Sequence, residues 1–227
     1  MFVQSLFGSD IIEGNSIQCA SPLFGDRVSL TNNTLTISAP WWCPDCGNIE
    51  EPGGFDENYG CVYIFELQGD GTWLETHQII NLELGYNTQL GYFGLSLSKS
   101  GDRLSVIPKM TQQVGGNKND LFLYEKQNDN SWLETFRTNA PPNTRYSNVR
   151  INEVNTDSLA VIKSRLDENS RTISIFNKGE SIWEEVIEFA PSDIDPSSNS
   201  LGAAHQSKNT LSFLENTIVV TDEDHEH

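Results

Sequence analysis

The chain has 227 residues, of which 37% are hydrophobic and 10% aromatic, enough for a packed core and too many for a disordered chain. It has 14 Lys and Arg against 32 Asp and Glu, and this net charge of -18 disfavours binding to nucleic acid or anionic membranes. No apolar run approaches the roughly 18 residues that span a bilayer, so we expect no membrane insertion.

The first residues of the chain, Met1–Leu6, lack the basic n-region and long apolar h-region of an intact signal peptide. The chain is therefore either cytoplasmic, or a mature form or fragment of a longer protein. Residues 2–7 are instead predicted to form a short strand.

Four hairpins with alternating or β-branched residues follow along the chain. Their two strands are joined by turns rich in Asn, Asp or Gly, the residues that tolerate tight turns. The predicted strand pairs are 27–30 with 34–40, 94–98 with 103–108, 148–151 with 158–162, and 210–214 with 217–220.

Each of the first three hairpins is followed by a second hairpin that carries a tryptophan directly after its turn. These second hairpins cover residues 62–75, 121–134 and 173–185, with Trp73, Trp132 and Trp183 at matching positions. The intervals between the tryptophans lie in the fifties, which is too long for one hairpin and suits a four-stranded unit. We interpret these tryptophans as packing residues, because a ligand does not require one in every unit.

Two successive hairpins form a four-stranded antiparallel unit, which buries both faces only when neighbouring units stack on it. Radial stacking gives a β-propeller, whose blades are four-stranded sheets, and a β-sandwich is the alternative. The sequence therefore predicts an all-β fold, a single β-propeller domain over residues 1–227. About three and a half blades are present, over residues 22–80, 91–138, 144–190 and a partial 200–222, with 2–7 as a stray strand.

Short motifs in these units resemble the FG-GAP repeat of integrin α-subunit propellers and bacterial surface proteins. Phe24-Gly25 and Phe93-Gly94 match the FG element, and Ser38-Ala39-Pro40 matches a degenerate GAP element. Gly60–Phe65 resembles the strand that follows it. The third unit has Arg145-Tyr146-Ser147 in place of FG. The resemblance implies a propeller with a binding role at the cell surface.

Calcium binding, which the resemblance also implies, does not carry over to this chain. Integrin-type repeats hold calcium in an Asp-x-Asp-x-Asp-Gly loop between their first two strands, and carboxylates spaced in this way suit a hard cation. The corresponding turns here, among them Thr31-Asn32-Asn33 and Lys99–Asp102, do not supply three spaced carboxylates. We therefore expect no metal site and no cofactor.

The chain contains four cysteines, Cys19, Cys43, Cys46 and Cys61, all within its first 61 residues. Disulfide bonds in an oxidising compartment are the favoured reading, and the four cysteines allow three pairings. Free thiols and a zinc site, in which Cys19 and Cys61 complete a Cys43/Cys46 pair, are the alternatives.

The longest insertion lies between two strands of the first unit and contains Trp41, Trp42, Phe55 and Tyr59. Aromatic side chains on a loop held by a rigid sheet are typical of a contact site, so we predict that this insert binds the ligand.

The predicted function is a non-enzymatic binding, adhesion or structural assembly module, located outside the cell or at its surface. Its partners are other proteins or further copies of the chain, because an incomplete propeller leaves sheet edges and apolar faces uncovered. A glycan-binding, lectin-like propeller is the first alternative. A hydrolase with carboxylates in the central channel is the second, although no Gly-x-Ser-x-Gly, His-Glu-x-x-His or phosphate-loop motif occurs.

Overall fold

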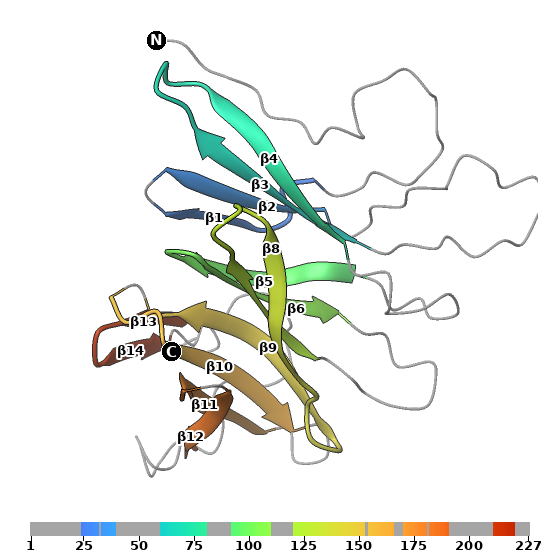
Figure 1. The fold of residues 1–227 in the computed structure, drawn as a ribbon. Helices are drawn as coiled ribbons and strands as arrows, with labels where there is room; N and C mark the ends of the chain where they lie inside the picture. The colour runs from blue at the N-terminus through green and yellow to red at the C-terminus, as the bar shows by residue number, and fades with distance from the viewer. Residues whose placement is uncertain are drawn as a thin grey trace, which may run out of the picture. The chain divides into compact units, whose positions relative to one another are not determined.

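A computed structural model describes residues 24–31, 33–39, 60–80, 92–109, 120–152, 154–165, 170–180, 182–190 and 211–220 (Figure 1). Fourteen strands and no helix occur in these ranges, and all strand pairs are antiparallel. A search of the same ranges for a helix that could span a membrane finds none.

The chain divides into two compact units, residues 1–95 with 108–115, and residues 96–107 with 116–227. The first unit holds one four-stranded sheet in which neighbouring strands follow one another in sequence. Its strands are β1 (Val28–Thr31), β2 (Thr34–Ala39), β3 (Cys61–Leu67) and β4 (Trp73–Ile80).

The second unit holds most of a second four-stranded sheet, all of a third, and a two-stranded hairpin, again in sequential order. The second sheet comprises β5 (Tyr92–Ser100), β6 (Arg103–Lys109), β7 (Leu121–Lys126) and β8 (Trp132–Thr138). The third comprises β9 (Thr144–Ile151), β10 (Ser158–Arg165), β11 (Ser170–Lys178) and β12 (Trp183–Phe189), and the hairpin is β13 (Leu211–Leu214) with β14 (Thr217–Val220).

The turns that join the third and fourth strands are alike in the first two sheets. Asp70 Oδ1 accepts hydrogen bonds from the backbone N–H, at 2.9 Å, and the hydroxyl, at 2.7 Å, of the threonine two positions later. Asp129 bonds the serine two positions later in the same way, at 2.9 and 2.6 Å. The next residues, Gly71 and Asn130, have φ angles of 84° and 68°, a conformation that Gly and Asn tolerate. The side-chain and backbone hydrogen bonds lower the pKa of both aspartates.

A β-bulge occurs at the same point of each four-stranded sheet. The register between the third and fourth strands shifts between Ile64 and Phe65, between Leu123 and Tyr124, and between Ile175 and Phe176. The fourth strand lies at the edge of its sheet, where bulges are common and bend the strand. The three sheets are therefore structural repeats of one another, as the tryptophan spacing predicts.

Sheet β9–β12 packs through both of its faces within the second unit. Leu159 and Val161 of β10 lie in a buried cluster that includes residues of sheet β5–β8. Ala160 and Ile162, which alternate with them and point to the opposite face, lie in a second cluster with residues of the β13–β14 hairpin. Figure 1 shows this hairpin beside β9 and β10. Within the second unit, sheet β5–β8, sheet β9–β12 and the β13–β14 hairpin are thus successive layers.

These features confirm the predicted fold class, an all-β partial propeller of four-stranded antiparallel blades with about three and a half blades present. Three sheets are complete blades and the β13–β14 hairpin is the half blade. Whether residues 1–227 form a single domain stays a prediction.

Candidate functional site

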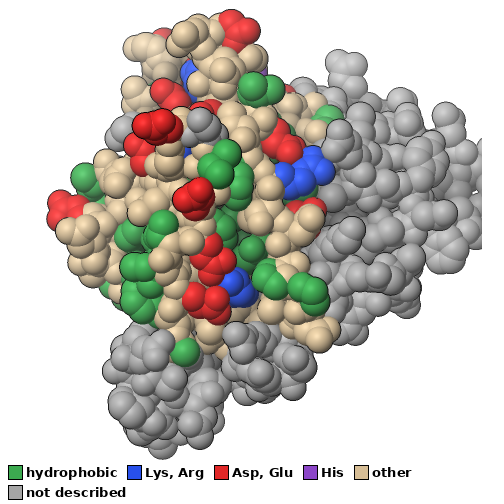
Figure 2. Space-filling view, turned by 60° about the horizontal axis from the view of Figure 1, so that its bottom comes forward, with side chains coloured by type: hydrophobic (Ala, Val, Ile, Leu, Met, Phe, Trp, Pro, Cys, Tyr) green, Lys and Arg blue, Asp and Glu red, His purple; other side chains and the backbone are tan. Residues whose placement is uncertain are grey.

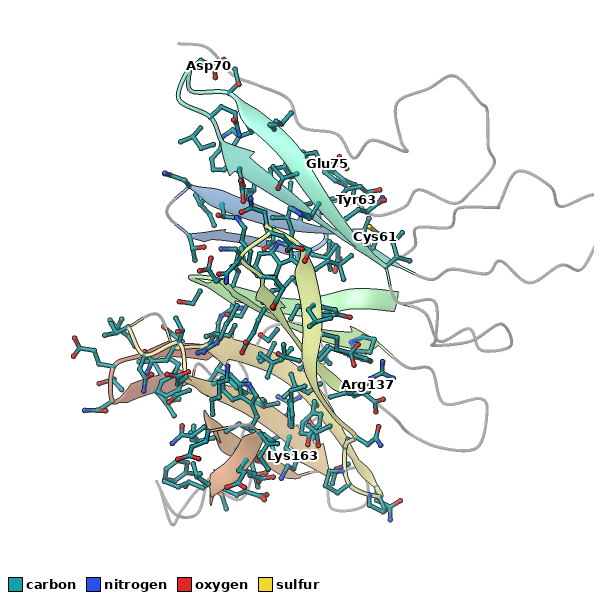
Figure 3. The ribbon with its side chains drawn as sticks, viewed as in Figure 1. Cys61, Tyr63, Asp70, Glu75, Arg137 and Lys163 are labelled. Carbon is teal, nitrogen blue, oxygen red and sulfur yellow. The ribbon has the colours of Figure 1, made fainter. Side chains whose placement is uncertain are left out.

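The predicted contact residues Trp41, Trp42, Phe55 and Tyr59 lie outside the described residues, but the two ends of their insert are placed. Ala39 at the end of β2 pairs directly with Cys61 at the start of β3, and neither is exposed to solvent. Figure 3 shows Cys61 at the end of the β3–β4 hairpin opposite its turn at Asp70. The insert therefore starts and finishes on adjacent, buried strand ends.

The predicted disulfide bonds stay a prediction. Cys19, Cys43 and Cys46 lie outside the described residues. Cys61 is 0% exposed and belongs to the apolar cluster of the first sheet, so its side chain lies at the base of the insert.

This apolar cluster covers one face of sheet β1–β4 and comprises Ile37, Ala39, Cys61, Tyr63 and Phe65, with Phe24, Leu35, Trp73 and Ile80 packed against it. The ring of Phe24 lies edge-on to Phe65, with centroids 6.5 Å apart. In sheet β9–β12 the ring of Tyr146 lies edge-on to Phe176 at 6.4 Å. Tyr146 thus takes the place of the FG aromatic in the third unit, in agreement with the alignment of the repeats.

Two apolar side chains on this face of the first sheet are exposed where their counterparts in the third sheet are buried. Val28 and Leu30 of β1 are 57% and 62% exposed. They pair with Ile37 and Leu35, and their side chains therefore share the face of the apolar cluster. Val149 and Ile151, which hold the same places in β9, are 0% and 1% exposed within the cluster that joins β9–β12 to β5–β8. We call Val28 and Leu30 the β1 patch.

A charged cluster occupies sheet β9–β12. The side chain of Lys163 is only 5% exposed, and its Nζ lies 2.8 Å from Glu185 Oε1 and 3.0 Å from Glu188 Oε2. Thr172 donates its hydroxyl to the other oxygen of Glu188 at 2.7 Å. Burial alone lowers the pKa of Lys163, but the hydrogen bonds from its ammonium to the two glutamates outweigh it and raise the pKa overall. The cluster keeps Lys163 charged, which suits a structural ion pair and not a catalytic base.

A second charged cluster links sheets β5–β8 and β9–β12. Arg103 lies 3.2 Å from Glu125 of its own sheet and 2.6 Å from Asp157 in the turn before β10. Its guanidinium also lies over the ring of Trp183, 5.6 Å from the centroid. Lys178 of β11 approaches Glu125 to 2.7 Å. These contacts connect sheet β5–β8 with sheet β9–β12. We call Arg103, Glu125, Asp157 and Lys178 the inter-blade clasp.

The repeated tryptophans pack as predicted in two of the blades. Trp183 is 4% exposed and belongs to the cluster between sheets β5–β8 and β9–β12, and Trp73 packs against the cluster of the first sheet. Trp132 is half-buried, and the ammonium of Lys99 lies over its ring at 5.8 Å.

The described residues contain no group of three or more His, Cys, Asp or Glu that could hold a metal ion. On the face that Figure 2 brings forward, acidic side chains lie among apolar ones, with few Lys and Arg between them. Neither charged cluster was foreseen from the sequence, nor was the exposure of the β1 patch. Of these, only the apolar alternation of Val28 and Leu30 left a signal in the sequence, since it matches that of Val149 and Ile151.

No protein-family model matches this chain, and no curated protein matches it. Among solved structures, a similar chain comes from a structural and mechanistic study of two prolyl endopeptidases and the role of their inter-domain dynamics in catalysis and specificity. The two chains are 14% identical with a TM-score of 0.40, and the similarity covers 70% of this chain and 19% of the other. A similarity this low says nothing about the function of this chain.

Proposed function

We propose that this chain is a non-enzymatic binding and assembly module, outside the cell or at its surface, that contacts partner proteins through the insert between β2 and β3. The observation that supports this proposal most is the pairing of Ala39 with Cys61, both fully buried. A loop whose two ends are held this firmly loses less freedom on binding than one on a mobile stem.

The side chains of the insert suit a protein contact. Trp41, Trp42, Phe55 and Tyr59 are all aromatic, and Trp and Tyr are enriched among the residues that dominate binding energy at protein interfaces. The net charge of -18 favours a partner with a basic surface, because complementary charge speeds association.

The test is excision of the insert. A short Gly-Asn turn that joins Ala39 to Cys61 should leave the sheet intact, because these residues already pair. We expect the excised chain to keep its cooperative thermal unfolding and to lose binding of the fluorescently labelled protein to intact cells. The double variant Trp41→Ala with Trp42→Ala should weaken binding at least about tenfold, since hot-spot tryptophans often contribute 2 kcal/mol or more. Leu74→Ala, at a residue of β4 that is 55% exposed, is the matched control and should bind normally.

Treatment of the cells distinguishes the class of partner. Protease treatment should abolish binding if the partner is a protein, whereas binding that survives protease and is lost after glycosidase treatment would identify a glycan instead. Full binding by the excised chain would show that the insert is not the contact site.

A further inference from the structure

We propose that the β1 patch of one chain binds the outer face of the β13–β14 hairpin of a second copy, so that copies associate head to tail. This inference rests on the assembly part of the function proposed above. Its test changes residues outside the insert. The two proposals can therefore fail separately: copies can associate even if the insert binds no partner, and the insert can bind a partner even if copies do not associate.

The first observation is the contrast between equivalent positions. In sheet β9–β12, Val149 and Ile151 are buried against sheet β5–β8. In the half blade, Leu211 and Phe213 hold the same places in β13 and are 1% and 8% exposed, buried against sheet β9–β12. Of the three first strands whose side chains are described at these places, only β1 has them more than half exposed, as the β1 patch.

The β1 patch is therefore apolar at positions that, in both other described cases, contact the sheet that precedes them in the chain. The surrounding face carries the same kind of packing as its counterpart: Phe24 against Phe65 in one sheet and Tyr146 against Phe176 in the other. The occupant that this face fits is therefore the outward, apolar face of another β-sheet layer.

The second observation is a partly exposed face of the required kind on the same chain. The side chains of β13 and β14 that alternate with Leu211 and Phe213 point away from sheet β9–β12. Among them, Leu214 is 48% exposed and Val219 is 51% exposed. This is the face onto which the following layer packs in the other blades: the opposite face of sheet β9–β12, with Ala160 and Ile162, receives the β13–β14 hairpin itself.

The β1 patch and the outer face of β13–β14 thus correspond to the two halves of an interface that the chain already makes twice within its second unit. Because these halves differ from one another, an association between copies is heterologous and extends into rings or filaments unless it is capped. Since each copy carries a net charge of -18, the copies repel one another at low salt. Added salt screens this repulsion, and association should become stronger as the salt concentration rises.

The decisive experiment mixes two variants of the full chain in sedimentation velocity. Leu30→Asp removes one half of the interface and Val219→Asp removes the other, and each variant alone should sediment as a monomer. An equimolar mixture should form a dimer, since each variant supplies the half that the other lacks. Both residues are more than half exposed, so the variants should fold, and unchanged thermal unfolding confirms that they do.

Leu74→Asp is the matched control, because Leu74 is 55% exposed in the same sheet but lies on β4, away from the β1 patch. This variant should associate as the wild-type chain does. The proposal is wrong if the wild-type chain is a monomer at all concentrations and salt conditions, if the mixture of variants stays monomeric, or if Leu74→Asp is as disruptive as Leu30→Asp. A monomeric wild type that both variants destabilise would mean that the two faces meet within one chain, and this outcome also overturns association between copies.

Discussion

Replacing Arg103 by alanine should loosen the packing of sheet β5–β8 against sheet β9–β12. Arg103 contacts Glu125, Asp157 and the ring of Trp183, and therefore connects both sheets through one guanidinium. Its side chain is only 16% exposed, so water does not screen these contacts fully. No other residue of the inter-blade clasp makes a cation–π contact with Trp183 among the described residues.

The size of the effect follows from the separate contacts. A partly desolvated cation–π contact contributes about 1 kcal/mol. The ion pair with Asp157, whose side chain is 56% exposed, contributes no more than about 1 kcal/mol. Loss of the bond to Glu125 is partly offset, because Lys178 still lies 2.7 Å from the same carboxylate oxygen. We expect a total loss of about 2 kcal/mol in the free energy of unfolding, or a Tm lowered by roughly 4–8 °C.

Equilibrium denaturation in guanidinium chloride, followed by tryptophan fluorescence, measures this loss. A double-mutant cycle with Lys178→Ala tests the mechanism, because the double variant leaves Glu125, which is 19% exposed, with neither cation. The double variant should lose at least about 1 kcal/mol more than the sum of the single variants. A loss below about 0.5 kcal/mol for Arg103→Ala, or strict additivity in the cycle, would refute the role of the inter-blade clasp.

Three further predictions concern the cores, turns and charges. Phe176→Ala should lower the free energy of unfolding, measured by chemical denaturation, by about 3–5 kcal/mol, because Phe176 is 3% exposed between two sheets. Leu133→Ala is the control: Leu133 is 55% exposed, so its loss should cost less than about 0.5 kcal/mol. Gly71→Ala should lower the free energy of unfolding by about 1–2 kcal/mol, because the φ angle of Gly71 is 84°. Nothing lies within 4 Å of the added carbon, so a steric clash does not contribute. Gly69→Ala, whose φ is not positive, should be neutral in the same assay. Because its two glutamate partners raise the pKa of Lys163 above the ordinary 10.5, its contribution to stability is complete below pH 10.5 and is lost as the pH rises through the raised value. Thermal melts from pH 7 to alkaline pH should therefore fall less steeply for Lys163→Met than for the wild type, and parallel curves would contradict this.

The repeating strands were predictable because each hairpin carries its own local signals. The turn residues and the alternation of apolar side chains predicted a strand that begins at residue 103 and another over residues 217–220. In the structure, β6 begins at residue 103 and β14 covers 217–220. The third unit differs: its first strand was expected over 148–151, but β9 begins at Thr144. The extra residues lack clear alternation, and a register shift opposite Ile162 and Lys163 lets the strand continue pairing through Tyr146.

The contacts between blades were not predictable, because they join residues that are far apart in the sequence. Arg103 reaches Glu125 and Thr156 across separations of 22 and 53 residues, and no local pattern marks such partners. The exposure of the β1 patch was not predictable from the sequence either. Its apolar alternation equals that of Val149 and Ile151, and only the structure distinguishes the exposed pair from the buried one. The insert residues Trp41 and Trp42 stay a prediction from composition and position.

The most direct test of the account is the mass of the wild-type chain in solution, measured by sedimentation velocity from low to high micromolar concentration and at two salt concentrations. The account predicts a mass that exceeds that of one chain, rises with concentration and rises further with added salt. A mass equal to one chain under all of these conditions would contradict it.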